Sequence, residues 1–282
     1  IVRLSEDEYY LVSAGAWTAY DADFLRKAVA DKEADFGRIE VQNVTTQWGV
    51  FAIAGPKSRD VLNAIIKDAD PATALSNKRF PWLSAKQIEL GMCPVNAIRV
   101  AYTGELGWEL HHPIEMQNYL FDLLEKAGEP HGMKLVGARA QNWLRQEKSY
   151  RAFGNELGRD ATPLEADLPR FVDLSKDFNG KAAMEAKGIR SKCVTLLIYG
   201  PADADPWGRE ALYAMDGTRV GRLTSGGYSV AFEKSIGMGY VKPEQAVVGT
   251  KLQVKMLDQL WNAEVVEDSP YDPKNAAIRV DG

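Results

Sequence analysis

The sequence changes character near residue 191, and this change constrains the fold more than any other feature. Beyond it lie short strand-like runs separated by Gly, Pro and Asp turns: KCVTLLIYG, ALYAMDG, TRVGRLTSGGYS, SIGMGYV, TKLQVKML and LWNAEVVE. Short strands at regular spacing without helical periods are typical of a small all-β barrel or sandwich. We therefore predict two domains, residues 1–190 and residues 191–282, of which the second is a small antiparallel β-barrel.

Residues 1–190 mix helical and extended patterns. Apolar residues that recur at helical spacing predict helices at about 18–30, around 61–66, at about 115–127 and at roughly 137–149. Extended runs are expected at 1–4, 8–13, 38–45, 48–55, 95–102 and 107–113, and residues 67–91 are expected to be irregular. Strands that alternate with helices predict an α+β body.

Composition excludes several classes of function. The chain of 282 residues is 45% hydrophobic with a net charge of −5, so the basic stripe of a nucleic-acid-binding protein is not expected. No stretch approaches the roughly 20 apolar residues that span a bilayer. Cys93 and Cys193 lie far apart in the sequence and indicate neither a disulfide framework nor a metal site.

Two motifs are weak candidates for binding sites. His111 and His112 are adjacent on an expected strand, so their side chains point to opposite faces and cannot share one metal ion. TSGGYS at residues 224–229 could form an anion-binding nest, although a plain β-turn is the simpler interpretation. The sequence has no Gly-rich nucleotide loop, and we expect no metal site.

Glu105 lies between Gly104 and Gly107 at the tip of an expected hydrophobic hairpin, AYTGELGWELHHP. One interpretation is a solvated turn carboxylate. The other is a carboxylate presented into a pocket, where its two acceptor oxygens suit a planar ring with two parallel N–H donors. Arg145, on an expected helix, is either a surface charge or a cation that faces the same pocket. The residues alone leave both alternatives open.

Five stretches, read in order, resemble one known family. They are GVFAIAGPKSRDVL, IRVAYTGELGWELHHP, LRQEKSYRAFGNELGRDATPLEADL, FNGKAAM and GRLTSGGYSVAFEKSIGMGYV. The series resembles the glycine-cleavage T-protein (aminomethyltransferase) family, and is closest to the folate-binding C-terminal region of dimethylglycine dehydrogenase and oxidase. The resemblance covers nearly the whole chain. It implies a T-protein-like, three-lobed folate-binding fold, here N-terminally incomplete, followed by the β-barrel.

The resemblance also implies a set of folate-binding residues in this sequence: Ser13, Ala14, Tyr102, Glu105, Leu106, Gly107, Arg145 and Phe153. Glu105 would hold the aminopyrimidine edge of the pterin. Arg145 matches the folate-contacting arginine of the family and would suit the glutamyl tail. Phe153 stands where the aminomethyltransferases proper have tyrosine, and this departure favours the amine-dehydrogenase branch.

The function implied is a tetrahydrofolate-dependent one-carbon transferase, the folate half of a dimethylglycine- or sarcosine-type amine dehydrogenase. It would capture the iminium or formaldehyde from a methylated amine as 5,10-methylene-tetrahydrofolate, with FAD only in an upstream oxidoreductase domain. The alternatives are a free-standing folate-dependent demethylase and a non-catalytic folate-binding module. Such a protein is expected to be soluble, in the bacterial cytoplasm or the mitochondrial matrix.

The chain begins at Ile1 inside an expected hairpin, IVRLSEDEYYLVS, and we expect a truncated or processed N-terminus. In the family, the carboxylate that assists the transfer is an Asp just before this strand, so the matching residue would lie upstream of Ile1. Glu6, Asp7 and Glu8 lie at the wrong end of the strand to replace it. We therefore expect the chain alone to retain a partial folate pocket with little transferase activity.

Overall fold

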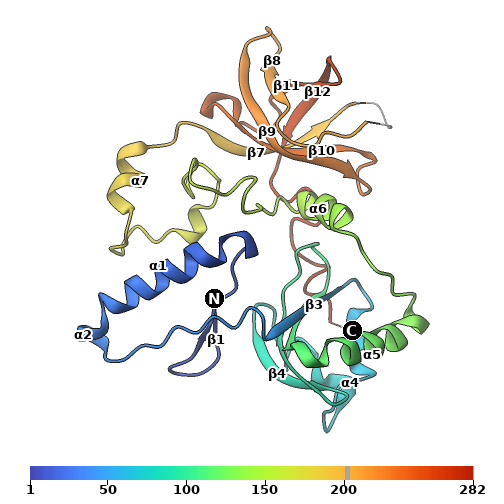
Figure 1. The fold of residues 1–282 in the computed structure, drawn as a ribbon. Helices are drawn as coiled ribbons and strands as arrows, with labels where there is room; N and C mark the ends of the chain where they lie inside the picture. Colours follow the sequence, from blue (N-terminus) through green and yellow to red (C-terminus); the bar gives the residue numbers. More distant parts are fainter. Residues whose placement is uncertain (201–203, 282) are drawn as a thin grey trace. The chain divides into compact units, whose positions relative to one another are not determined.

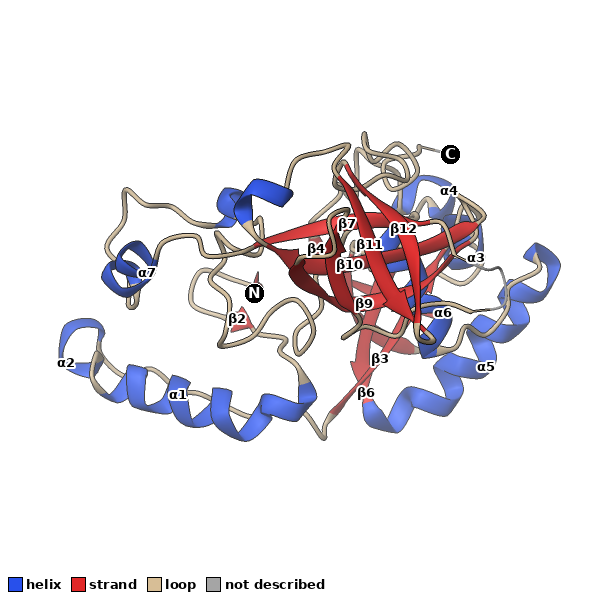
Figure 2. Ribbon diagram, turned by 90° about the horizontal axis from the view of Figure 1, so that it is seen from above, coloured by secondary structure: helices blue, strands red, loops and turns tan. Residues whose placement is uncertain are grey.

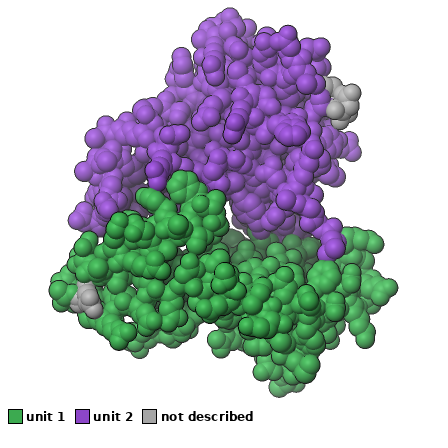
Figure 3. Space-filling view, in the orientation of Figure 1, with its two compact units in different colours: residues 1–101, 106–134, 278–282 green, residues 102–105, 135–277 purple. Residues whose placement is uncertain are grey.

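The computed structural model describes residues 1–200 and 204–281, and the chain divides into two compact units (Figure 3). Unit 1 comprises residues 1–101, 106–134 and 278–282, and unit 2 comprises residues 102–105 and 135–277. The boundary expected near residue 191 lies inside unit 2, where it separates a helical and irregular part from a β-barrel. That boundary stays a prediction.

Unit 1 is built on a four-stranded antiparallel sheet in the order β3-β6-β5-β4 (Figure 1). Its strands are β3 Trp48–Ala54, β4 Ala85–Leu90, β5 Cys93–Ile98 and β6 Gly107–Pro113. The apolar face of the sheet packs with α3 Ser58–Asn63, α4 Pro71–Ala74 and α5 Gln117–Gly128. The core of unit 1 includes Ile53, Leu62, Phe80, Trp108, Leu110 and Leu120.

The opposite face of this sheet is more polar and meets the N-terminal hairpin. In that hairpin, β1 Val2–Arg3 pairs with β2 Tyr9–Tyr10. The Tyr10 hydroxyl and His111 Nδ1 share a hydrogen bond of 3.1 Å. His112 instead stacks on Phe51, with ring centroids 4.9 Å apart, and Phe51 packs against the core. The two histidines thus lie on opposite faces of the sheet, as predicted.

The helix predicted at 18–30 is present as α1 Thr18–Ala30, followed by α2 Glu33–Phe36. None of the residues of α1 is buried, and Tyr20 and Phe24 are both about half exposed. The apolar periodicity therefore predicted the helix and its bounds, but it does not correspond to a buried face.

Unit 2 contains a closed barrel of six antiparallel strands in the order β10-β7-β12-β11-β8-β9 (Figures 1 and 2). The strands are β7 Lys192–Ile198, β8 Ala211–Ala214, β9 Arg219–Ser229, β10 Lys234–Val241, β11 Lys251–Met256 and β12 Gln259–Val266. Alternate side chains fill its interior, among them Leu196, Ile198, Leu223, Leu252 and Val254. The predicted barrel is confirmed.

Shorter elements complete both units. Unit 2 has α6 Ala138–Glu147, which contacts β9 and β10, and α7 Lys181–Lys187. The 3-10 helices are η1 Gly15–Trp17, η2 Ile114–Met116, η3 Glu129–His131, η4 Pro169–Phe171 and η5 Pro243–Gln245.

Some of the expected elements differ from the observed ones. Residues 38–45 form no strand, and the region 67–91 contains α4 and β4 rather than being irregular throughout. The strand expected at 95–102 ends at Ile98. Helix α3 ends at Asn63, because Ile66 forms a β-bridge with Leu90 instead of continuing the helix. These differences arise where a partner strand, rather than local sequence, decides the conformation.

Candidate functional site

The loop of residues 102–105 connects β5 to β6 but belongs to unit 2, and its shape depends on Gly104. Gly104 has a φ of +80°, and a Cβ there would lie 2.4 Å from Cγ of Lys148. Any other residue would be strained by the backbone angle and by the lysine side chain together. Glycine therefore lets the loop lie directly on Lys148.

Glu105 is half-buried in this loop, and one of its two carboxylate oxygens accepts a hydrogen bond from the protein. The Tyr271 hydroxyl donates a hydrogen bond to Glu105 Oε1 at 3.2 Å, and within the described parts of the chain no other hydrogen bond to the side chain is found. A carboxylate can accept about four hydrogen bonds. Glu105 therefore retains acceptor capacity for a ligand, most of all at Oε2.

Lys148 is buried beneath the loop and has main-chain partners. Its Nζ donates to the carbonyl oxygens of Tyr271 at 2.9 Å and Asp272 at 2.6 Å. Burial lowers the pKa of Lys148, although the negative charges of Asp272 and Glu105 act in the opposite direction. Lys148 thus ties the segment that carries the Tyr271 hydroxyl to the end of α6.

Tyr102 begins the same loop and forms part of an aromatic pair. Its hydroxyl donates to the Arg151 carbonyl at 3.0 Å. Its ring stacks on Tyr150, with centroids 6.0 Å apart and an angle of 23° between the planes. Burial raises the pKa of both phenols, so both rings stay uncharged at neutral pH. Tyr102 is 37% exposed, which leaves apolar ring surface within reach of a ligand.

Leu106 and Gly107 follow the loop and belong to unit 1. The Leu106 carbonyl accepts hydrogen bonds from the Gly55 N–H at 2.8 Å and from the Ser58 hydroxyl at 3.0 Å. A Cβ at Gly107 would lie 2.5 Å from the Ile53 carbonyl oxygen. Both residues therefore fix the start of β6 against β3, and their expected contact with a ligand stays a prediction.

Ser13, Ala14 and Phe153 lie on exposed segments of their own units. Ser13 and Ala14 precede η1, where the Ala14 carbonyl accepts from the Trp17 N–H at 2.9 Å. Phe153 is about half exposed and forms an isolated β-bridge with Leu157. The ligand contacts expected for these three residues stay predictions.

Arg145 is fully buried, and partners within unit 2 use its five N–H groups. Nη1 donates to Glu156 Oε2 at 2.8 Å and to the Tyr150 carbonyl at 2.9 Å. Nε and Nη2 donate to Asn142 Oδ1 at 3.0 and 2.9 Å, and Nη2 also to the Ser225 hydroxyl. A ligand carboxylate would have to displace one of these partners. The folate contact expected for Arg145 stays a prediction, and its partners argue for a structural role.

Glu156 completes this network, and no local pattern in the sequence pointed to it. Its Oε1 accepts from the hydroxyls of Thr224 at 2.6 Å and Ser225 at 2.5 Å, and its Oε2 also accepts from the Ala152 N–H at 2.9 Å. A buried arginine is commonly paired with a carboxylate, so an arginine assigned to the core would have prompted a search for a buried glutamate or aspartate. No sequence pattern pointed to Tyr271 as a partner of Glu105.

TSGGYS lies within strand β9, as the strand-like run TRVGRLTSGGYS predicted, and the β-turn considered for residues 224–229 is wrong. A Cβ on Gly227 would lie 2.0 Å from Cδ1 of Trp143, and one on Gly226 would lie 2.5 Å from the Pro206 carbonyl oxygen. The two glycines therefore allow close approach of α6 and of the segment around Pro206 to the barrel.

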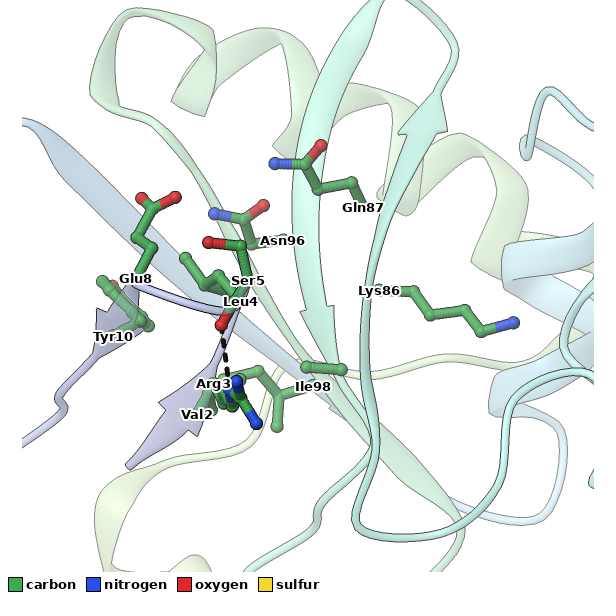
Figure 4. Close-up of a pocket in the computed structure, with 11 residues that line it drawn as sticks. Val2, Arg3, Leu4, Ser5, Glu8, Tyr10, Lys86, Gln87, Asn96 and Ile98 are labelled. Carbon is green, nitrogen blue, oxygen red and sulfur yellow. Dashed lines mark hydrogen bonds between the residues drawn. The ribbon is translucent and has the colours of Figure 1, made fainter.

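A cavity of about 430 Å³ lies in unit 1, between the N-terminal hairpin and the sheet (Figure 4). Its polar lining includes Ser5, Glu8, Gln87 and Asn96. Arg3 also lines it, but its guanidinium donates to the main-chain carbonyls of Ser5 and Glu6. Glu6 and Glu8, with Asp7 between them, are exposed in the turn between β1 and β2. None of the expected folate-binding residues lines this cavity.

Metal clusters and reactive thiols find no support in the parts of the chain that the structure describes. There, no cluster of His, Cys, Asp and Glu side chains could hold a metal ion. Cys93 and Cys193 are free and buried, and burial raises the pKa of the Cys193 thiol to about 12. Each helix in those parts is too short or too polar to cross a lipid bilayer.

Known protein families match nearly the whole chain. Residues 1–176 match the model of the GCVT N-terminal domain, and residues 192–272 match that of the glycine cleavage T-protein C-terminal barrel domain. Mitochondrial dimethylglycine dehydrogenase of Rattus norvegicus is 34% identical over 99% of this chain and 32% of that protein. The aminomethyltransferase of Caldanaerobacter subterraneus subsp. tengcongensis is 32% identical over 96% of this chain and 70% of that protein.

A solved structure shows the same fold. The crystal structure of glycine cleavage system aminomethyltransferase T from Bartonella henselae superposes with a TM-score of 0.70 at 23% identity, over 88% of this chain and 66% of that chain. The chain spans about a third of the length of the dimethylglycine dehydrogenase it matches. Because both family models match it, as does an aminomethyltransferase of which it covers 70%, the chain belongs to the glycine cleavage T-protein (aminomethyltransferase) family.

Proposed function

We propose that the chain binds tetrahydrofolate through Glu105 and takes part in one-carbon transfer from a methylated amine. Family membership supports a transferase. The similarity to mitochondrial dimethylglycine and sarcosine dehydrogenases, of which the chain spans about a third, supports a role as the folate-binding part of such an enzyme. In that role the iminium or formaldehyde released by amine oxidation would be captured as 5,10-methylene-tetrahydrofolate.

The observation that carries the proposal is the unfilled acceptor capacity of Glu105. The aminopyrimidine edge of a pterin presents two parallel N–H donors, and a carboxylate presents two oxygens at a matching spacing. Tyr271 uses one acceptor position of Oε1, so Oε1 and Oε2 can each still accept from one of the two ligand donors. The residues of the loop therefore fit this ligand edge.

The neighbouring aromatic pair suits the same ligand. The Tyr102 and Tyr150 rings are nearly parallel, and flat aromatic surfaces bind conjugated rings by stacking. When bound, tetrahydrofolate supplies two amine nitrogens that accept the one-carbon unit. The proposed contact set also includes these residues: Ser13, Ala14, Leu106, Gly107 and Phe153. FAD belongs to the proposal only as the cofactor of a separate oxidoreductase domain.

The test compares two glutamates that each accept a tyrosine hydrogen bond. Tetrahydrofolate is titrated anaerobically into the wild-type chain, Glu105→Gln and Glu264→Gln. Glu264 is the control, because on the barrel it also accepts from a tyrosine hydroxyl, that of Tyr199 at 3.1 Å, and in addition pairs with Lys251. Glu105→Gln places an amide donor against a ligand donor, and we expect at least about tenfold weaker binding. Glu264→Gln is expected to bind normally.

Turnover distinguishes the proposed function from its alternatives. Methylene-tetrahydrofolate formation is measured with formaldehyde or a methylated amine as donor, with and without a flavin amine dehydrogenase. Activity on the amine only with the flavin enzyme supports the proposal. Activity on a methylated substrate without flavin would identify a demethylase. Binding without any turnover, also when an N-terminal segment of a relative that carries the transfer aspartate is supplied, would identify a non-catalytic module. Equal tetrahydrofolate affinity in wild type and Glu105→Gln would show that Glu105 is a solvated turn residue.

A further inference from the structure

Tyr271 brings a distant part of the chain to the proposed ligand loop. It lies 166 positions from Glu105 in the sequence, yet its hydroxyl donates to Glu105 Oε1. The negative charge of Glu105 is the main cause, followed by burial, of a raised pKa for the Tyr271 phenol. The phenol therefore remains protonated, and remains a hydrogen-bond donor, throughout the neutral pH range.

The main chain around Tyr271 is fixed by three consecutive residues at the end of α6. The Tyr271 N–H donates to the Glu147 carbonyl at 3.1 Å. Lys148 Nζ donates to the carbonyls of Tyr271 and Asp272. The Ser149 hydroxyl oxygen accepts from the Ser269 N–H at 2.8 Å. The position of the phenol is thus set by an anchored segment and not by a freely moving loop.

We propose that Tyr271 is a positioning residue that holds the Glu105 carboxylate in one orientation, with Oε2 and the second acceptor position of Oε1 open to the two ligand donors. This inference rests on the proposed function, in which Glu105 binds the pterin edge. An exposed glutamate loses rotamer freedom when a ligand orders it, and that loss weakens binding. A carboxylate already ordered by Tyr271 avoids much of the loss. Tyr271 itself is not required to touch the ligand.

A double-mutant cycle tests the inference. Tyr271→Phe removes only the hydroxyl, and we expect roughly threefold to tenfold weaker tetrahydrofolate binding. In the Glu105→Gln background the same change should alter affinity by less than about twofold, because its partner is already lost. Tyr199→Phe, which removes the matched hydrogen bond to Glu264, should leave affinity unchanged. Thermal unfolding of each variant shows whether it is folded.

A second measurement needs no folate. Tyrosines labelled with ¹³C at Cζ are titrated by NMR, and the Tyr271 signal is identified by its absence in Tyr271→Phe. The charged groups that face this phenol are Glu105, Asp272 and Glu147. Only the first is removed in Glu105→Gln, so the ionisation midpoint of Tyr271 should fall in that variant.

The outcomes separate the inference from the proposed function. Full affinity in Tyr271→Phe, when Glu105→Gln binds weakly, would overturn the positioning role and leave the proposed function standing. Equal losses from Tyr271→Phe in both backgrounds would also overturn it, because the phenol would then act independently of Glu105. Unchanged affinity in Glu105→Gln would overturn the proposed function, and the inference with it.

Discussion

Unit 2 contains two polar clusters that differ in how fully their hydrogen-bonding capacity is used. In the first, Arg145 and Glu156 are almost completely buried, with side chains 1% and 0% exposed, and their polar atoms have protein partners. In the second, the half-buried carboxylate of Glu105 accepts one hydrogen bond, from Tyr271. Residue type and resemblance suggested a ligand for both Arg145 and Glu105.

The difference separates a structural charge from a ligand-binding one. A buried charge whose partners are all present stabilises the fold only as part of its group, and the removal of one member leaves another uncompensated. A partly exposed charge with unused acceptor capacity adds little to folding but can bind a donor. Mutations in the first cluster should therefore lower the free energy of unfolding. Mutations in the second should weaken ligand binding.

The largest expected effect is that of Arg145→Ala on stability. The change leaves the Glu156 carboxylate buried without its cation, which typically lowers the free energy of unfolding by about 3–5 kcal/mol. Denaturant unfolding measures it. Arg139→Ala is the control on the same helix. Arg139 is 59% exposed, and its ion pair with Asp205 and its contacts over two tryptophan rings should each contribute no more than about 1 kcal/mol.

The comparison would fail if Arg145→Ala kept its stability and lost folate affinity. A greater loss for polyglutamylated folate than for a pterin without the tail would then support the tail contact expected from the resemblance. Equal stability losses in Arg145→Ala and Arg139→Ala would also contradict the structural role.

A smaller loss of stability is expected for Gly227→Ala, which would push α6 away from the barrel. In Gly227→Ala the new Cβ would lie 2.0 Å from Cδ1 of Trp143, and overpacking of this kind typically costs about 1–3 kcal/mol. Thermal unfolding measures the loss. Gly217 is unsuitable as a control because its φ is +83°. The control is Gly158, which has neither a positive φ nor an atom near the position that an added Cβ would take. Gly158→Ala should therefore keep wild-type stability, and a similar loss in both variants would refute the packing argument.

Glu165 offers a pH test of a second fully engaged carboxylate. Burial opposes its ionisation, but hydrogen bonds from the Thr162 N–H and from Arg190 hold its pKa below the ordinary 4.5. The unfolded chain therefore takes up this proton first, so the stabilisation is present above about pH 4.5 and is lost as the pH falls through the lower folded pKa. Glu165→Gln should show a shallower loss of stability on acidification, measured by denaturant unfolding at several pH values. If the free energy of unfolding fell equally with pH in wild type and Glu165→Gln, Glu165 would not be a stabilising, fully hydrogen-bonded carboxylate.

The smallest expected effect is that of Glu105→Gln on stability. The side chain is half-buried and accepts one hydrogen bond, so we expect a change within about 0.5 kcal/mol. Differential scanning calorimetry of the folate-free chain measures it. A loss as large as that of Arg145→Ala would show that Glu105 belongs to the structural class and would remove the contrast between the two clusters.

Local patterns predicted the elements whose conformation depends on their own residues. The spacing of Tyr20 and Phe24 predicted α1 with its bounds, and short runs between turn residues predicted the strands of the barrel. The same patterns failed at residues 38–45 and at Ile66. In those places the presence or absence of a partner strand decides the conformation, and the local sequence carries no record of it.

The sequence by itself determined the family, the α+β body with its C-terminal barrel, and Glu105 as a candidate ligand group, because these follow from periodicity, turn residues and ordered motifs. Only the tertiary structure decided the environment of each charge. It placed Arg145 in a closed network with Glu156, Gly227 against Trp143, and Tyr271 on Glu105. The physical reason is that hydrogen-bond capacity is used or left free by groups far apart in the chain, and their meeting is a property of the folded state.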